Sequence, residues 1–186
     1  NNVDISNTAQ QGINGLYVTD FDLVNSISDA CGNEVNEGCL RIVNLSGTAT
    51  IIDSNLSNAS GRVAQIENFG VTLALTVNNS TFSDTQSSGF GTDGLEITSD
   101  GAANTTIDII NSFFLRNRTN GLQVFSKGTS NVSVDVTGST FDRETDIGIG
   151  IDLAADDSAT LNFNVVNNPM INSHGGNAVN VFSDGT

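Results

Sequence analysis

Few residues of this sequence have the types and spacing that acid–base catalysis would need. Asp156 and Asp157 are adjacent carboxylates in the segment ADDSA, and His174 is the only histidine. Two carboxyl groups can act as general acid and general base when both reach one substrate. Side chains that are neighbours along an extended chain point in opposite directions, so we expect this pair to stay solvated. We therefore predict that the protein is not an enzyme.

Other polar residues suggest binding. Asp142, Glu144 and Asp146 could supply oxygen ligands to calcium, although their spacing matches no calcium motif. Calcium is therefore a possible ligand, and no other cofactor is expected. Arg116 and Arg143 fall one repeat apart, and two stacked guanidinium groups could bind the carboxylate or sulfate of a glycan. Neighbouring acids could equally neutralise both arginines, so the two interpretations stay open.

The two cysteines predict a disulfide. Cys31 and Cys39 flank the segment GNEVNEG, which has no regular apolar pattern and reads as a loop. Two thiolates alone do not complete a zinc site, and His174 is distant in sequence. A disulfide between Cys31 and Cys39 indicates an oxidising compartment, and hence a secreted, extracellular or cell-surface protein.

Composition narrows the classes of partner. The chain of 186 residues has a formal charge of −15 and only six Lys and Arg residues, which argues against nucleic acid as a partner. No apolar run is long enough to span a bilayer, so no membrane insertion is expected. Gly, Asn, Ser and Thr are abundant and strong helix formers are scarce, which favours strands and turns.

Two short phrases alternate along the whole chain. The first is a small residue followed by an apolar–any–apolar triplet, and it occurs at 15–18, 39–42, 63–66, 94–97, 121–124, 150–153 and 178–181. The second is an alternating strand that ends in an Asn-Ser-like pair, and it occurs at 3–8, 23–26, 51–54, 75–80, 107–112, 134–139 and 162–168. Such alternation is typical of strands with one buried face.

The closing pairs of the second phrase predict sharp turns at a regular period. Their first residues tolerate a left-handed backbone, and they are Asn7, Asn25, Asp53, Asn79, Asn111, Gly138 and Asn167. Most of these positions are separated by 26 to 32 residues, which indicates a solenoid of β-coils. The sequence thus predicts one all-β domain over residues 1–186, a right-handed parallel β-helix (β-solenoid) of about seven coils that is uncapped at both ends.

Equivalent positions of stacked coils should form columns. We expect Phe82, Phe114 and Phe141, with Leu95, Leu122 and Ile151, to be buried and stacked. A second column is expected to change from apolar to charged, in the order Phe21, Leu45, Phe69, Asp100, Lys127, Asp156 and Asp184. A third should contain Gly12, Ala30, Asn58, Asp84, Arg116, Arg143 and Asn172.

The repeated phrases NNSTF, INSFF and TGSTF, followed by GLEI, GLQV and GIDL, resemble those of right-handed parallel β-helix proteins of the pectate-lyase-like superfamily. That resemblance covers essentially the whole chain. It implies the fold, whereas the family includes lyases, hydrolases, adhesins and fibres. Catalytic members carry Asn-Thr-Asp, Gly-His-Gly and Arg-x-Lys motifs that this sequence lacks. The resemblance therefore favours the adhesin or surface-fibre type.

The two ends of the chain, when joined, reproduce the repeat. FSDGT at 182–186 followed by NNVDISNT at 1–8 resembles FSKGTSNVSVDVTGST at 125–140. We expect a solenoid cut at a whole number of coils, whose copies continue one another end to end as an extracellular filament or adhesin stalk. The expected contact edges are Val3, Asp4, Ile5 and Ser6 on one copy and Asn180, Val181, Phe182 and Ser183 on the other. The alternative is a polysaccharide-binding or polysaccharide-degrading module.

Overall fold

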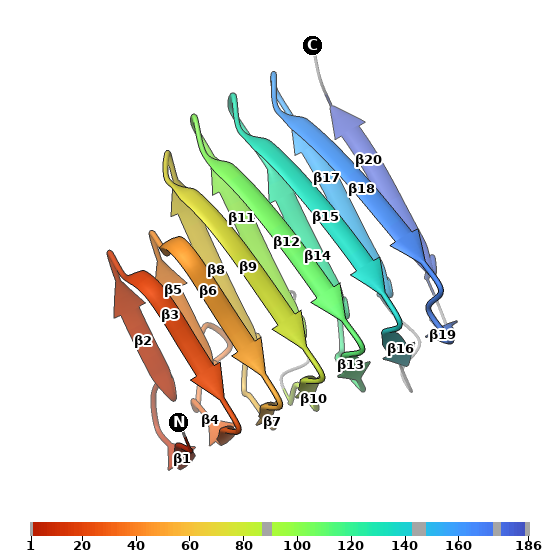
Figure 1. Cartoon of the computed structure of the whole chain (residues 1–186). Coiled ribbons are helices and arrows are strands. Elements are labelled where there is room, and N and C mark those ends of the chain that lie inside the picture. The colour runs from red at the N-terminus through yellow and green to blue at the C-terminus, as the bar shows by residue number, and fades with distance from the viewer. Residues whose placement is uncertain (1, 87–90, 143–147, 173–175, 185–186) are drawn as a thin grey trace.

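The part of the chain that the structure describes consists of β-strands, turns and short connections (Figure 1). A computed structural model describes residues 2–86, 91–142, 148–172 and 176–184. These ranges contain twenty strands and no helix, and each strand pairs in parallel with its equivalent one repeat away. The paired strands form three sheets, which we call A, B and C.

Each turn of the solenoid crosses the sheets in the order A, B, C. Sheet A contains β1 (Asp4–Thr8), β4 (Ile27–Cys31), β7 (Asn55–Ser57), β10 (Thr81–Ser83), β13 (Phe113–Leu115), β16 (Thr140–Asp142) and β19 (Met170–Asn172). Sheet B contains β2 (Ile13–Leu16), β5 (Leu40–Val43), β8 (Ala64–Phe69), β11 (Leu95–Asp100), β14 (Leu122–Ser126), β17 (Ile151–Asp156) and β20 (Val179–Asp184). Sheet C contains β3 (Thr19–Val24), β6 (Ser46–Ile52), β9 (Thr72–Asn78), β12 (Asn104–Ile110), β15 (Asn131–Thr137) and β18 (Thr160–Val166).

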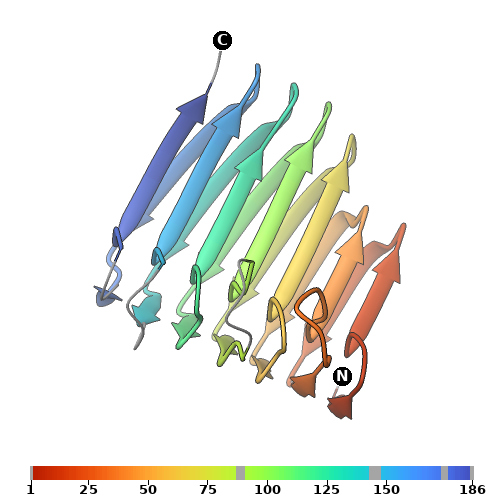
Figure 2. The same cartoon turned by 180° about the vertical axis from the view of Figure 1, so that it is seen from behind.

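The described strands make six complete turns and two strands of a seventh. Figures 1 and 2 show these turns stacked along one axis, with the first and last strands at opposite ends of the stack. The predicted all-β parallel β-solenoid is therefore confirmed, with six complete turns among the described residues.

Apolar alternation builds the core because every second side chain of a strand faces inward. In β12, for example, Ile107 and Ile109 are fully buried while Asp108 between them faces outward. The rings of Phe82, Phe114 and Phe141 stack with centroid distances of 5.2 and 4.6 Å. Their burial is confirmed, as is that of the other predicted core residues, Leu95, Leu122 and Ile151.

The corner between sheets C and A is held by the closing pairs of the second phrase. The first residue of each pair has a positive φ, for example 49° at Asn25 and 47° at Asn79. In the five pairs that begin at residues 25, 53, 79, 111 and 138, the next residue is a buried serine. The backbone N–H of each of the first four serines donates to the hydroxyl oxygen of the serine one turn further along. This ladder runs Ser26 to Ser54 (3.2 Å), Ser54 to Ser80 (3.1 Å), Ser80 to Ser112 (3.2 Å) and Ser112 to Ser139 (3.1 Å). It links successive turns inside the corner.

The first coil departs from the predicted register. The sequence pattern places VDISNT in the second phrase, whereas in the structure Asp4–Thr8 forms β1 in sheet A and pairs with β4. Asn7 aligns with Ala30, and both residues have a positive φ. Gly12 is therefore not the first member of the column that contains Ala30, Asn58, Asp84 and Arg116; Asn7 is. Only 18 residues separate Asn7 from Asn25, too few for three strands and their turns.

Two further expectations fail with that register. Phe21 pairs with Ala49, and the exposed Phe69 pairs with Asp100, so Phe21, Leu45 and Phe69 do not form one buried apolar column. The described strands also do not amount to a whole number of coils, because β1 lies in sheet A whereas β20 lies in sheet B. Joining the two in sequence would omit one sheet C strand.

The phenylalanine stack should dominate core stability in the middle turns. Replacing the fully buried Phe114 by Ala should cost about 3–5 kcal/mol, because it removes a ring from the stack and leaves a cavity. Its neighbour Phe113 is 41% exposed on the same strand and serves as the matched control. Chemical unfolding should place Phe113→Ala within about 1 kcal/mol of the parent. Equal losses for the two variants would contradict the inward orientation of Phe114.

Candidate functional site

The connections between sheets A and B are the longest and most varied of each turn. They include residues 32–39 between β4 and β5 and residues 116–121 between β13 and β14. Figure 2 shows these connections on one side of the solenoid, where the loop after β4 projects (orange). Variable loops on a rigid scaffold are the usual location of binding sites. We call this side the A–B corner.

The predicted disulfide is present at the A–B corner. Cys31 and Cys39 are bonded, and both are fully buried. Within the loop they close, the Glu37 carboxylate accepts the N–H groups of Asn33 (2.7 Å) and Glu34 (3.0 Å). A Cβ at Gly38 would collide with the backbone oxygen of Arg62, so only glycine lets this loop pack on the third turn. The disulfide loop, residues 32–38, therefore packs directly against the backbone of Arg62.

Arg62 is the centre of a charged cluster that the sequence did not reveal. Its Nε donates to Oε2 of Glu96 at 2.6 Å and lies 3.6 Å from Oδ2 of Asp93. Gln65 donates to the other Glu96 oxygen at 2.9 Å. Because Arg62 precedes β8 and Asp93 and Glu96 belong to the next turn, the cluster joins two coils.

A third coil fixes the orientation of Asp93. Its Oδ1 accepts the Thr119 hydroxyl at 2.6 Å and the Asn120 N–H at 3.0 Å. Oδ2 makes no hydrogen bond among the described residues, and at 3.6 Å its contact with Arg62 is an ion pair without a hydrogen bond. The carboxylate is thus buried with one oxygen fully engaged and one facing a shared cation.

Electrostatics at this cluster raise the pKa of Asp93. Burial of its side chain raises the pKa of Asp93, and the nearby Glu96 charge adds to that effect. The Thr119 hydrogen bond and the Arg62 charge lower the pKa, but by less. The Arg62 guanidinium thus contacts the carboxyl groups of both Asp93 and Glu96, and its contact with Glu96 is the shorter one. Since the Asp93 side chain is inaccessible to solvent, it cannot reach a substrate directly.

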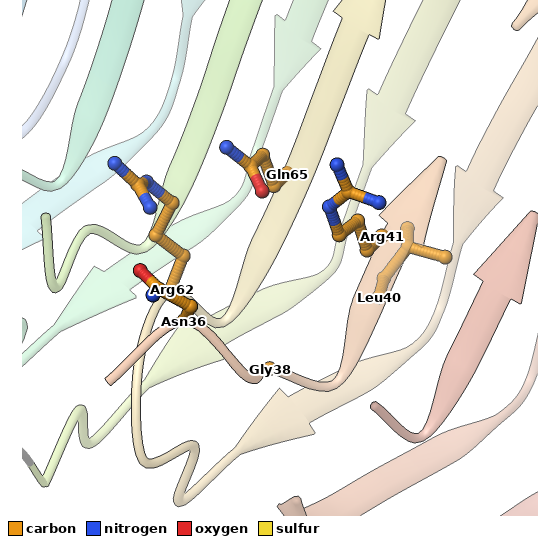
Figure 3. Close-up of a pocket in the computed structure, with 6 residues that line it drawn as sticks. All are labelled: Asn36, Gly38, Leu40, Arg41, Arg62 and Gln65. Carbon is orange, nitrogen blue, oxygen red and sulfur yellow. The ribbon is translucent and has the colours of Figure 1, made fainter. Parts of the chain in front are cut away.

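A narrow pocket lies against the same cluster (Figure 3). It is lined by Asn36, Gly38, Leu40, Arg41, Arg62 and Gln65. Its volume of about 10 Å³ is close to that of a single water-sized probe. In Figure 3, Arg41, Arg62 and Gln65 project on the same side. Arg41 is engaged with Glu67 at 2.6 Å. The small volume limits the pocket to an occupant of about the size of a water molecule.

The predicted arginine pair is only partly described. Arg116 lies one turn from Asp84, as expected, and binds it with both Nε (2.5 Å) and Nη2 (2.6 Å). This hydrogen bonding lowers the pKa of Asp84. Arg143 lies outside the described residues. Of the two interpretations, the one in which a neighbouring acid neutralises the arginine therefore fits Arg116.

Of the three calcium candidates, too, only one lies within the described residues. Asp142 is described, and its Oδ1 accepts the Asn172 amide at 3.1 Å. Glu144 and Asp146 lie outside the described residues, as does His174. Within the described ranges, no group of three or more His, Cys, Asp or Glu side chains could hold a metal ion.

The charged column is confirmed in its last four positions. Ser126 pairs with Ser99 on one side and Ala155 on the other, so Lys127 follows in register between Asp100 and Asp156. Its Nζ lies 4.8 Å above the ring centroid of Phe125. Asp157, with φ of 59°, turns away from this column and accepts the Gly128 N–H at 3.3 Å. Asp156 and Asp157 therefore do not converge on one point.

A sequence signal for the Asp93 cluster does exist. Thr92-Asp93-Gly94 and Thr119-Asn120-Gly121 are equivalent triplets immediately before sheet B strands. Their middle residues differ, because Asp93 carries a carboxylate where Asn120, one turn later, carries an amide. The third participant, Arg62, could not be found in this way, because its loop has no matching triplet.

Comparisons with family models, curated proteins and solved structures found no match. Among the described residues, no helix is long and apolar enough to span a membrane.

The raised pKa of Asp93 gives a pH prediction. Its folded state binds a proton more tightly than its unfolded state, so this residue lowers stability as pH rises from about 3.8 through the raised pKa. Asp93→Asn should remove that decline while keeping the Oδ1 contacts. Thermal unfolding of both proteins across this pH range measures the difference. A constant difference between them would contradict a raised pKa.

The lowered pKa of Asp84 has the opposite sign. Its ion pair with Arg116 stabilises the fold above the ordinary pKa of 3.8, and this contribution is lost as pH falls through the lowered value. Because both side chains are partly exposed, Asp84→Asn should cost at most about 1 kcal/mol at neutral pH, and less at high salt. Asparagine also tolerates the positive φ at this position. A loss that did not change with salt would indicate a packing defect.

Proposed function

We propose that the chain is a structural β-solenoid that continues axially into neighbouring copies or repeats, as part of an extracellular filament or adhesin stalk. The exposed core of its last turn carries this proposal. Phe163 and Val181 face inward, yet they are 47% and 49% exposed. Their partners one turn earlier, Val134 and Leu153, are fully buried. Another β-coil would bury both the apolar side chains and the backbone edge beneath it.

The topology limits how copies can meet. If β1 of one copy paired with β19 of another, and β2 with β20, sheets A and B would continue across the contact. Sheet C would then lack one strand between β18 and β3. The expected contact edges, residues 3–6 and 180–183, thus belong to different sheets. A continuous solenoid needs a sheet C strand directly after β20.

Charge and the disulfide support the proposed surroundings. The buried disulfide suits an oxidising, extracellular or cell-surface location. The net charge of −15 keeps lateral surfaces mutually repulsive, which favours end-to-end contact over side-to-side aggregation. From the resemblance of the repeated sequence phrases alone, we also propose kinship with the adhesin type of the pectate-lyase-like superfamily and a role without catalysis.

Polysaccharide binding is the second candidate. A row of outward polar side chains runs along sheet B, and it consists of Arg41, Gln65, Glu96, Gln123, Asp152 and Asn180. Much of its hydrogen-bonding capacity is used internally, for example between Gln123 and Asp152 at 2.9 Å. This internal pairing favours the structural role over glycan recognition.

Solution measurements on the intact chain test the proposed assembly. Scattering and electron microscopy should find elongated particles with an axial repeat of roughly 34 Å, from seven coils at about 4.8 Å each. Phe163→Asp should shift the population towards monomers by placing a charge on the exposed end. Phe69→Asp is the control, since Phe69 is similarly exposed but lies at a lateral corner. Compact monomers of the unmodified chain at all concentrations would refute the assembly.

A further inference from the structure

An open groove runs along the corner between sheets C and A, where β6 and β9 turn into β7 and β10 (Figure 1). Its volume is about 380 Å³, and it is lined by Asn25, Ser26, Ile27, Asp53, Ser54, Asn55, Asn79 and Thr81. Ligand sites commonly have volumes of about 300–1,000 Å³. This groove, which we call the C–A groove, is therefore large enough for a small organic ligand.

Two rows of outward side chains form the sides of the C–A groove. One row consists of the positive-φ corner residues Asn25, Asp53 and Asn79. The other row belongs to sheet A and pairs in register from turn to turn, through Ile27, Asn55 and Thr81. Between the rows, the buried hydroxyl groups of Ser26 and Ser54 donate to backbone carbonyl oxygens. The two rows, and not the serines beneath them, thus present polar groups to a ligand.

Most of these polar groups are not used within the protein. The side chains of Asn25, Asn55 and Thr81 form no hydrogen bond with another described residue. The single internal pair of the two rows is Asn79, which donates to Oδ1 of Asp53 at 2.6 Å. The outward polar row of sheet B differs, because its members bond to one another. The criterion that argues against ligand binding on sheet B therefore favours the C–A groove.

The charge of the C–A groove selects the class of ligand. Of the described residues that line it, none is Lys or Arg, and Asp53 supplies one carboxylate. An anionic ligand would meet this carboxylate and the net charge of −15 without any compensating cation. A hydroxyl group both donates and accepts, so it can bond to an amide, a hydroxyl or a carboxylate alike. The lining thus suits an uncharged, hydroxyl-rich molecule.

Apolar contacts lie at both ends of the sheet A row. Ile27 is 45% exposed at one end, and Phe113, which follows Thr81 in register, is 41% exposed at the other. The C–H faces of sugar rings are apolar and pack against such aliphatic and aromatic side chains. From Ile27 to Phe113 the row covers three coil steps, roughly 14 Å at about 4.8 Å each. A short chain of sugar rings could contact the whole row.

The main chain beside the groove argues against a peptide as the ligand. β7 pairs with β4 on one side and with β10 on the other, so its backbone N–H and C=O groups are occupied. An extended peptide therefore cannot add to this sheet as a further strand. Recognition at the groove must come from side chains.

We propose that the C–A groove binds a short uncharged oligosaccharide, whose chain runs along the solenoid axis from Ile27 to Phe113. The groove is on the side of the solenoid and belongs to the second to fifth turns. Binding there is independent of any end-to-end contact. A stalk built from this chain would carry the binding site along its length.

Titration with defined oligosaccharides tests this assignment. Cellohexaose, mannohexaose, xylohexaose and maltohexaose are the uncharged probes, hexagalacturonate is the anionic counterpart, and pentalysine is the cationic peptide probe. In spectra of ¹⁵N-labelled protein, at least one uncharged probe should shift the side-chain amide signals of Asn25, Asn55 and Asn79. The amides of Asn104 and Asn131, exposed at the other end of the sheet C strands, should not move.

Matched threonine variants locate the contact. Thr81→Ala removes one hydroxyl from the groove and should weaken binding of the uncharged probe about three- to tenfold, as expected for one lost hydrogen bond. Thr140 occupies the same sheet A row beyond Phe113, so Thr140→Ala should bind as the unmodified chain does. Phe113→Ala should also weaken binding, because it removes the ring that packs against a sugar. Thermal unfolding of each variant confirms that it is folded.

Three outcomes would overturn the proposal. The first is that no uncharged probe shifts the groove amides at millimolar concentration. The second is that hexagalacturonate or pentalysine binds the groove more tightly than every uncharged probe, which would assign it to another class of ligand. The third is equal binding by Thr81→Ala and Thr140→Ala, which would place the contact elsewhere. None of these outcomes bears on axial assembly, which the scattering and microscopy measure separately.

Discussion

In-register parallel stacking is the constraint on which this structure depends. Each residue lies directly above its equivalent one turn earlier, about 4.8 Å away, so every side chain must be compatible with the same position in two other turns. Apolar columns satisfy this condition through contact, as the three stacked phenylalanine rings do. Polar columns satisfy it when donor and acceptor alternate. The serine corner does so with a hydroxyl and a backbone N–H at every step.

Charged columns show the cost of the same constraint. Asp108 and Asp135 are directly paired on the outer face of sheet C. Partial burial raises the pKa of Asp108, and the Asp135 charge raises it further. Elsewhere an amide lies over the acid, as Asn79 does over Asp53 at 2.6 Å. In so acidic a chain, amide-over-acid pairs let carboxylates stack without repulsion.

The sequence was sufficient for features that recur in every turn. Alternation identified the strands, the Asn-Ser-like pairs identified the corner, and the spacing of Phe82, Phe114 and Phe141 identified their column. It was insufficient where a turn differs from the others. The first coil is shorter, so VDISNT was placed in the wrong sheet although its residue types suit sheet C. The Asp93 cluster escaped because its members come from strands and from loops of different length in three turns, and only packing brings them together.

The position of the disulfide has a mechanical consequence. Cys31 and Cys39 are both in the second turn, so the bond closes a loop within one coil and does not fasten one coil to the next. Tension along the axis is therefore resisted only by contacts between turns, and the coils would detach in succession from the loaded end. The second coil would release less chain than the others. Because Cys31 and Cys39 are eight residues apart, the bond between them keeps roughly 26–29 Å of contour length from being extended.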